Sequence, residues 1–187
     1  MIRHQRVLTT LLAIAACFTL ACADEPEPVA YSESVGLKLS GMKPKDVENN
    51  VVSEEKNVNT ETGNPYGEFL KNAKDNLGGK EPSYIKLMKA TVGLHSESDG
   101  LSSLGQVFTK IELFVSTSDV TKTLGTASSV SGSEVSVTID SSVDWQALAP
   151  VMIAGDFKLG LRCETGATTP KEWEARLFMD LNFSAFE

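Results

Sequence analysis

Hydrophobic and polar residues alternate along most of the second half of the chain. The clearest run is residues 172–186, where every second residue is apolar: Trp173, Ala175, Leu177, Met179, Leu181, Phe183 and Ala185. Similar alternation is found in residues 107–118, 133–140 and 156–164. A period of two is typical of a β-strand with one face in the core and the other in solvent. Strands of this kind form antiparallel sheets.

Three further segments are also expected to be strands. Residues 34–40 place Val35, Leu37 and Leu39 on one face, and residues 120–127 have a weaker strand pattern. Residues 83–95 change phase midway, and a β-bulge near Met88 and Lys89 would restore the alternation. These segments bring the expected total to six or seven strands.

One segment has a helical period instead. Asn64 followed by Pro65 is a favourable helix start, and Gly78 is a favourable stop. Between them the apolar residues recur at intervals of three and four: Tyr66, Phe69, Leu70, Ala73 and Leu77. The spacing predicts one short amphipathic helix over residues 65–78.

Two connections between these elements differ in character. Residues 41–63 are polar, charged and rich in asparagine, which predicts a long mobile loop with at most a weak strand at Val51 and Val52. Residues 144–150 predict one helical turn that is capped by Asp144 and precedes the next strand.

The expected fold of residues 34–187 is a single, mainly β domain. Strands with one apolar face can bury it by packing two sheets together, and the number and spacing of the strands suit an immunoglobulin-like antiparallel β-sandwich. The cysteine and tryptophan signature of antibody domains is absent, so this prediction rests on the strand pattern alone. A small β-barrel is the alternative.

The N-terminal residues have a different composition from the domain. Arg3 and Arg6 precede an uncharged apolar run, residues 7–21. That run is shorter than the roughly 20 residues that a membrane-spanning helix needs. A basic head, a short apolar stretch and small residues at its end predict a signal peptide over residues 1–21.

The end of this leader, "TLAC" at residues 19–22, resembles the lipobox of bacterial lipoproteins. The resemblance implies cleavage before Cys22, attachment of lipid to this cysteine and anchoring in a membrane of the cell envelope. Two other processing sites stay open. "IAAC" would place the lipid on Cys17, and "ACA" would allow ordinary cleavage after Ala23.

Residues 22–33 continue as a tether. The stretch "ADEPEP" that follows Cys22 is acidic and rich in proline, so it buries no apolar surface and is expected to stay extended. We expect an anchor in the outer membrane rather than the inner one, with free secretion as the alternative. Cys163 would then be the remaining cysteine, without an intramolecular disulfide partner, and its position in an alternating run predicts burial.

The net charge limits the classes of partner. The chain has 17 lysine and arginine residues against 25 acidic ones, and cleavage of the leader removes two of the 17, which leaves a net charge of −10. So acidic a protein is not expected to bind nucleic acid or to adhere to anionic lipid headgroups by charge. We expect the membrane to be reached through the N-terminal lipid.

Residues that could carry catalysis are scarce. His95 is the single histidine beyond the leader, and the chain has no nucleotide-binding motif, so neither a histidine-based zinc site nor a Ser-His-Asp triad is expected. We therefore expect no cofactor and no enzyme. The predicted function is a binding or adaptor module for an envelope protein or glycan. The alternatives are a structural lipoprotein that self-associates and a secreted soluble β-domain.

Four phenylalanines fall on the faces that the alternation assigns to solvent: Phe108, Phe114, Phe178 and Phe186. If their two strands were neighbours, these rings would form an apolar patch of the kind that soluble monomers seldom leave open. Either the helix over residues 65–78 covers that face, or the four rings form a surface for a partner.

Overall fold

The computed structural model describes residues 29–61 and 63–187, and this part of the chain is mainly β. Two helices, α1 (Pro65–Asn76) and α2 (Trp145–Ala154), and two short 3-10 turns, η1 (Pro44–Asp46) and η2 (Leu104–Gln106), lie between the strands. The strands are β1 (Val29–Met42), β2 (Val51–Val58), β3 (Tyr84–Leu94), β4 (Phe108–Ser116), β5 (Thr121–Ala127), β6 (Glu134–Ile139), β7 (Phe157–Thr165) and β8 (Ala175–Phe186).

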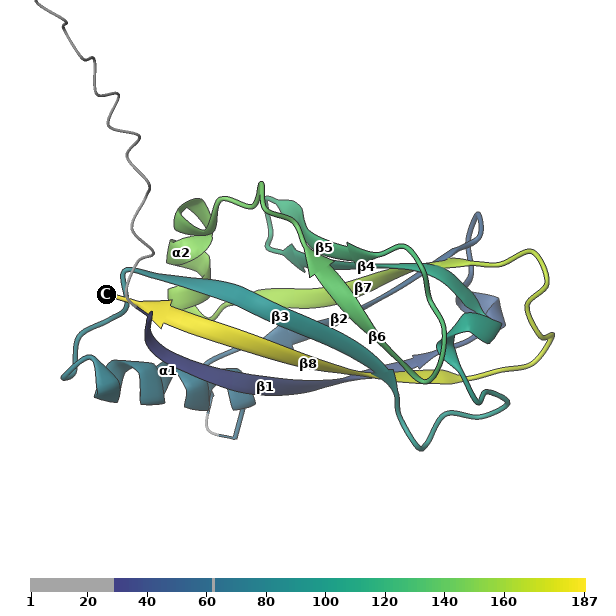
Figure 1. Ribbon diagram of the computed structural model, residues 1–187, viewed down its shortest axis with the longest axis horizontal. Coiled ribbons are helices and arrows are strands. Elements are labelled where there is room, and N and C mark those ends of the chain that lie inside the picture. The colour runs from purple at the N-terminus through teal and green to yellow at the C-terminus, as the bar shows by residue number, and fades with distance from the viewer. Residues whose placement is uncertain (1–28, 62) are drawn as a thin grey trace, which may run out of the picture.

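The strands form one antiparallel sheet of eight strands in the order β1-β8-β3-β6-β5-β4-β7-β2. The sheet curls until its two halves face each other, so that it is nearly closed as a barrel (Figure 1). The mainly β, antiparallel class is confirmed. The arrangement corresponds to the barrel alternative, because one sheet continues through the β5–β6 pair instead of splitting into two.

The two ends of the barrel differ. Both helices and the turn at residues 117–120 lie at the end where β1 begins and β8 finishes, which we call the helix end (Figure 1). The opposite end, the loop end, carries η1, η2 and the connections at residues 128–133 and 166–174. Because each strand runs antiparallel to its neighbours, successive connections alternate between the two ends.

The barrel interior is filled by the predicted apolar faces. The inward residues of β8 are fully buried: Ala175, Leu177, Met179, Leu181, Phe183 and Ala185. In β7 the predicted face, from Phe157 to Cys163, is buried as well. Burial raises the pKa of the Cys163 thiol, because a thiolate would lose its hydration there. The burial of Cys163 predicted from the alternation is thereby confirmed.

The segment expected to be a loop, residues 41–63, contains a full strand. β2 pairs along its whole length with β7, from Val51 opposite Glu164 to Val58 opposite Phe157. The loop prediction is wrong there because the middle of β2 is polar and carries no alternating signal. Its place is set by backbone pairing with β7. The short strand expected at Val51 and Val52 is confirmed and extends further.

The predicted tether, residues 22–33, is too long at its C-terminal end. Residues 29–33 belong to β1, which pairs with β8. The leader, Cys17, Cys22 and the cleavage sites lie outside the described residues.

Helix α1 begins after Asn64, as predicted, but it does not pack on the outer face of the strands that carry the four phenylalanines. The Asn64 side chain accepts a hydrogen bond from the backbone N–H of Tyr66 at 3.0 Å and caps the helix. The apolar face of α1 closes the helix end of the barrel, where the Tyr66 ring meets the rings of Phe157 and Phe183 edge to face at 5.1 and 5.2 Å. The prediction that α1 covers the outward phenylalanines is therefore wrong.

α2 is capped as predicted but is longer than one turn. The Asp144 carboxylate accepts a hydrogen bond from the Ala147 N–H at 2.9 Å, and the helix continues to Ala154. It ends at Gly155, whose φ of 61° is the left-handed conformation that glycine adopts without strain. Trp145 and Met152 are buried beneath it.

Two bulges adjust the faces of the strands. The register of β3 against β8 shifts between Leu87 and Lys89, which confirms the predicted bulge and leaves Met88 exposed. The register of β4 against β7 shifts between Phe108 and Lys110. This second bulge, which the sequence did not indicate, turns Phe108 into the core.

Candidate functional site

The four phenylalanines predicted as a partner surface do not lie together. Phe108, Phe114 and Phe186 are 1%, 2% and 5% exposed, and Phe178 alone is exposed, at 39%. Their strands, β4 and β8, are separated in the sheet by β3, β6 and β5. The prediction of one shared apolar patch is therefore wrong.

Each buried ring has its own partner. Phe108 packs edge to face on Trp173 at 5.8 Å, and Phe186 stacks on Tyr84 at 4.6 Å with the ring planes 2° apart. Phe114 lies outward on β4, directly across from Gly160 of β7, and the Arg162 guanidinium lies 5.3 Å from its ring centre. These contacts account for three of the four rings within the fold.

Phe178 covers a glycine in the same way. Its ring would lie 2.7 Å from a Cβ atom placed on Gly36 of β1, so the absence of a side chain there makes room for it. The ring thus fills a gap in the outer face of the sheet, and the rest of it remains accessible to solvent.

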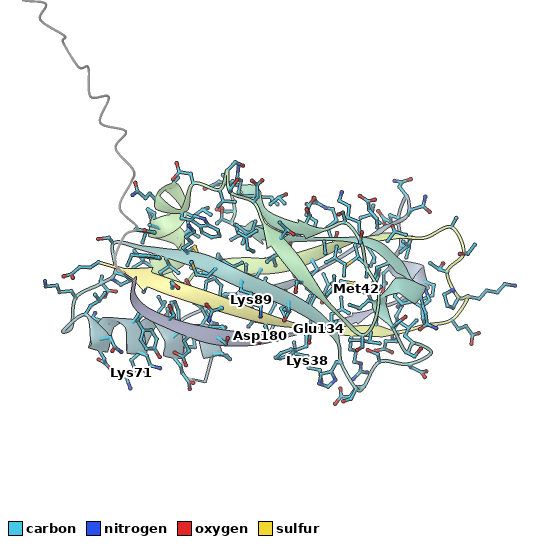
Figure 2. All side chains as sticks on the ribbon, viewed as in Figure 1. Lys38, Met42, Lys71, Lys89, Glu134 and Asp180 are labelled. Atoms are coloured by element: carbon cyan, nitrogen blue, oxygen red, sulfur yellow. The ribbon has the colours of Figure 1, made fainter. Side chains whose placement is uncertain are left out.

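Charged side chains near the loop end pair with one another. Glu97 accepts hydrogen bonds from Lys38 at 2.7 Å and Arg176 at 2.8 Å, while Glu174 binds Arg176 at 2.9 Å and Lys43 at 3.1 Å. Figure 2 shows Lys38 on the outer side of the barrel. The two cations lower the pKa of Glu97, with Lys38 as the larger cause. We interpret this network as structural, since each charge in it is paired with one of the opposite sign.

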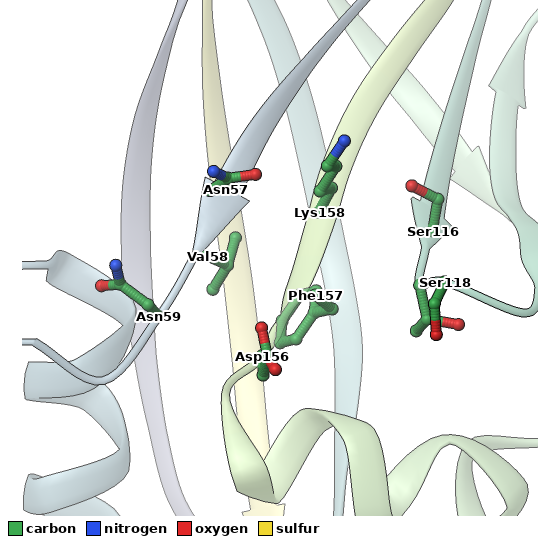
Figure 3. A pocket seen from close by; sticks show the side chains of 9 residues that line it. Asn57, Val58, Asn59, Ser116, Ser118, Asp156, Phe157 and Lys158 are labelled. Atoms are coloured by element: carbon green, nitrogen blue, oxygen red, sulfur yellow. The ribbon is translucent and has the colours of Figure 1, made fainter.

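A polar hollow lies at the helix end, between the last residues of β2 and β4 and the first of β7. It has a volume of about 410 Å³ and is lined by Asn57, Val58, Asn59, Ser116, Thr117, Ser118, Asp156, Phe157 and Lys158. Figure 3 shows Lys158 on β7 between Asn57 on one side and Ser116 on the other, with α2 beyond. Cross-strand pairing fixes this row, because Lys158 lies opposite both Asn57 and Ser116.

An apolar hollow of about 430 Å³ lies beside the polar one, between α2 and the turn that joins β4 to β5. Its apolar lining is entirely aliphatic: Val115, Val120, Ala147, Leu148 and Val151. Thr117 lines both hollows. The two spaces together offer a polar and an apolar surface side by side.

Hydrogen bonds hold the turn that separates the hollows. The Thr117 hydroxyl oxygen accepts from the Val120 N–H at 3.2 Å, and the Thr117 N–H donates to the Val120 carbonyl at 2.9 Å. This turn holds Val120, 58% exposed, facing Leu148 and Val151 across the apolar hollow. The apolar side is therefore preformed.

The charges at the two hollows are of both signs. The Lys158 ammonium pairs with Glu55 at 3.1 Å near the polar hollow, which Asp156 also lines. Lys122, Asp119 and Asp144 line the apolar hollow. The site thus carries a small excess of negative charge, with two lysines against four acidic residues.

The sequence prediction missed this site, although one signal was present. All ten residues of α2, "WQALAPVMIA", are uncharged, and nine of them are apolar, with Gln146 as the polar exception. A helix that is apolar on all sides is normally buried on all sides. α2 lies at the surface, so its outer apolar face marks a place that something else can cover.

The described residues show neither a membrane-spanning helix nor a metal cluster. Within residues 29–61 and 63–187, no helix combines the length and the apolar content that crossing a bilayer requires. Across the same residues, no three histidine, cysteine or acidic side chains converge as a metal site would need.

No protein-family model matches the chain, and no curated protein matches it either. A solved structure described as Desmodium yellow mottle tymovirus is similar at 11% identity over 98% of this chain and 95% of that chain. The TM-score is 0.29, and a similarity at this level supports no inference about fold or function.

Proposed function

We propose that this protein is a lipid-anchored lipoprotein of the cell envelope that binds a ligand at the helix end of its barrel and catalyses no reaction. The lipid is attached to Cys22, and residues 22–28 form the tether. This proposal combines the leader, which resembles that of bacterial lipoproteins, with the position of the two hollows.

The observation that carries the proposal is the end of the barrel at which β1 starts. β1 starts at Val29, at the helix end, and the polar and apolar hollows lie at that same end. Residues 22–28, fully extended, span at most about 25 Å. A lipid on Cys22 would therefore hold the hollows close to the bilayer surface.

The site itself favours binding over catalysis. It offers amides, hydroxyls and aliphatic groups, and no histidine is among the residues that line the two hollows. A hollow with an aliphatic side and a few polar groups is typical of small-ligand sites.

The test is the mass of the N-terminal peptide of the mature protein, purified from membrane and soluble fractions of its native host. We expect a peptide that begins at Cys22 and carries a diacylglycerol group, found in the membrane fraction. The variant Cys22→Ser should move the protein to the soluble fraction, whereas Cys163→Ser should leave it on the membrane.

Two results would contradict the proposal. An unmodified peptide beginning at Asp24 would mean that the protein is secreted without an anchor. A lipid on Cys17 would mean that the tether is longer and that the hollows are not held near the bilayer.

A further inference from the structure

The apolar hollow has a composition suited to an alkyl chain. All of its apolar lining is aliphatic, and the part contributed by Val120, Leu148 and Val151 is accessible to solvent in the isolated chain. An aromatic or planar ligand would be expected to meet at least one ring or amide plane for stacking, and none lines this hollow. Its volume of about 430 Å³ is near the lower end of the range for small-ligand sites, which suits a single chain.

The neighbouring hollow is suited to a polar head. It presents the amides of Asn57 and Asn59 and hydroxyl groups on residues 116–118, which can both donate and accept hydrogen bonds. Thr117 lines both hollows, so a ligand that fills both would have the junction between its apolar part and its polar part next to this residue. That is the chemistry of an amphiphile.

The charges suggest which kind of head. Lys158, whose ammonium group also pairs with Glu55 at 3.1 Å, and the carboxylate of Asp156 both line the polar hollow. Asp156 would repel a purely anionic headgroup, and Lys158 would repel a purely cationic one. A zwitterionic head can place its phosphate near Lys158 and its amine near Asp156.

We propose that the helix end binds one zwitterionic phospholipid from the membrane that holds the protein, with an acyl chain in the apolar hollow and the headgroup in the polar hollow. This inference rests on the proposed function, since the short tether is what brings the hollows to the bilayer. Leu148 and Val151 on one side, and Val120 on the other, would shield the acyl chain of the lipid from water.

The experiment measures binding of monomeric 1-palmitoyl lysophosphatidylethanolamine, below its micelle concentration, to the full chain carrying Cys22→Ser, which has no lipid of its own. Equilibrium dialysis gives the affinity, and native mass spectrometry gives the stoichiometry. We expect one lipid per chain.

Two aspartate variants test the apolar hollow. Val151→Asp and Val120→Asp each place a charge against the acyl chain and should weaken binding by about tenfold or more. Gln146→Asp is the matched control, since it adds the same charge to an exposed position of α2 outside the hollow and should bind as the parent does. Val120 is in an exposed turn, so its variant is expected to fold even if Val151→Asp does not.

A second pair of variants tests the headgroup. Lys158→Met keeps the aliphatic stem and removes the charge, and it should weaken binding of the phospholipid about threefold or more. Lys56→Met, on the neighbouring strand and outside the hollow, should have no effect. Palmitate, which has the chain without the zwitterionic head, should bind more weakly than the phospholipid.

Several outcomes would overturn the inference. Unchanged binding by the Val120→Asp variant would show that the lipid lies elsewhere. Binding to vesicles without binding to monomeric lipid would indicate adhesion to a surface, and a dimer that Val120→Asp dissociates would show that a second copy covers the hollow. None of these results affects the mass of the N-terminal peptide, so that measurement tests the lipid anchor at Cys22 independently of phospholipid binding.

Discussion

The hydroxyl of Tyr66 donates a hydrogen bond to the carbonyl oxygen of Met152 at 3.0 Å, and this bond joins α1 to α2. The ring is fully buried at the helix end of the barrel, and burial raises the pKa of the hydroxyl, so the group stays protonated and able to donate. The two helices that close this end are therefore tied to each other as well as to the sheet.

Removal of this hydroxyl should destabilise the fold. In Tyr66→Phe the Met152 carbonyl loses a buried partner, and we expect a loss of about 1–2 kcal/mol in the free energy of unfolding, measured by urea denaturation. Tyr31→Phe is the control, because the Tyr31 hydroxyl donates its hydrogen bond to Glu33 at a partly buried position. This variant should lower the free energy of unfolding by about 0.5 kcal/mol or less. Equal losses in the two variants would contradict the importance of the α1–α2 bond.

The contact between Phe114 and Gly160 predicts a second result. A Cβ atom at position 160 would lie 2.5 Å from the Phe114 ring and 2.8 Å from the Glu54 carbonyl oxygen. We expect Gly160→Ala to cost about 1–3 kcal/mol, because either the ring or the backbone of β2 must move. Gly93→Ala, where the nearest atom would be 3.8 Å away, should be close to neutral in the same denaturation experiment. A neutral Gly160→Ala would mean that the Phe114 ring is not held over β7.

The different positions of Phe108 and Phe178 predict that the two rings have different roles. Phe108→Ala removes a core ring from its contact with Trp173 and should cost about 3–5 kcal/mol in thermal or urea unfolding. Phe178→Ala, at a ring that is 39% exposed, should cost about 1 kcal/mol. If the two losses were similar, the bulge that turns Phe108 inward would be in doubt.

The pairing of Glu97 with two cations predicts a pH dependence. Lys38 and Arg176 lower the pKa of this carboxyl in the folded protein below its ordinary value of about 4.3. The charged form is thus favoured by folding, so the stabilisation is present above the ordinary pKa and is lost as the pH falls through the lowered folded value. Glu97→Gln should therefore be less stable than the parent at neutral pH, and the difference should disappear once the pH has fallen below the lowered folded pKa of Glu97.

Urea titrations at several pH values measure this effect, because urea, unlike guanidinium, adds no salt to screen the pairs. Glu134→Gln, at an exposed carboxylate on β6, serves as the control for the loss of a negative charge. A stability difference for Glu97→Gln that does not change with pH would argue against the ion pairs as its source.

The features of the fold that could be predicted from the sequence are those that depend on residues close together in the sequence. The buried face of β8, the Asn64 cap and the bulge at Met88 all follow from residues within one element. β2 was missed because its central residues, Glu54 to Lys56, are polar, and its strand conformation depends on pairing with β7, which is distant in sequence. Propensity cannot show a strand that tertiary pairing imposes.

The candidate site depends even more on distant pairs. Asn57, Ser116 and Lys158 form one row only because β2, β7 and β4 are neighbours in the sheet. The strand order was not predictable from periodicity, and neither was the bulge that moved Phe108. The apolar composition of α2 was visible, and it becomes informative once the helix is known to lie at the surface.

The register of β1 on β8 has a consequence for how the protein folds. Val29 pairs with Phe186, so the first described strand finds its hydrogen-bonding neighbour in the last residues of the chain. Contacts between residues so far apart in sequence close large loops, and folds rich in them form slowly, on the scale of milliseconds to seconds. The sheet cannot be completed until β8, which lies between β1 and β3, has been synthesised. Until then β1 lacks the neighbour that supplies its hydrogen bonds in the fold, and its backbone groups must bond to water instead.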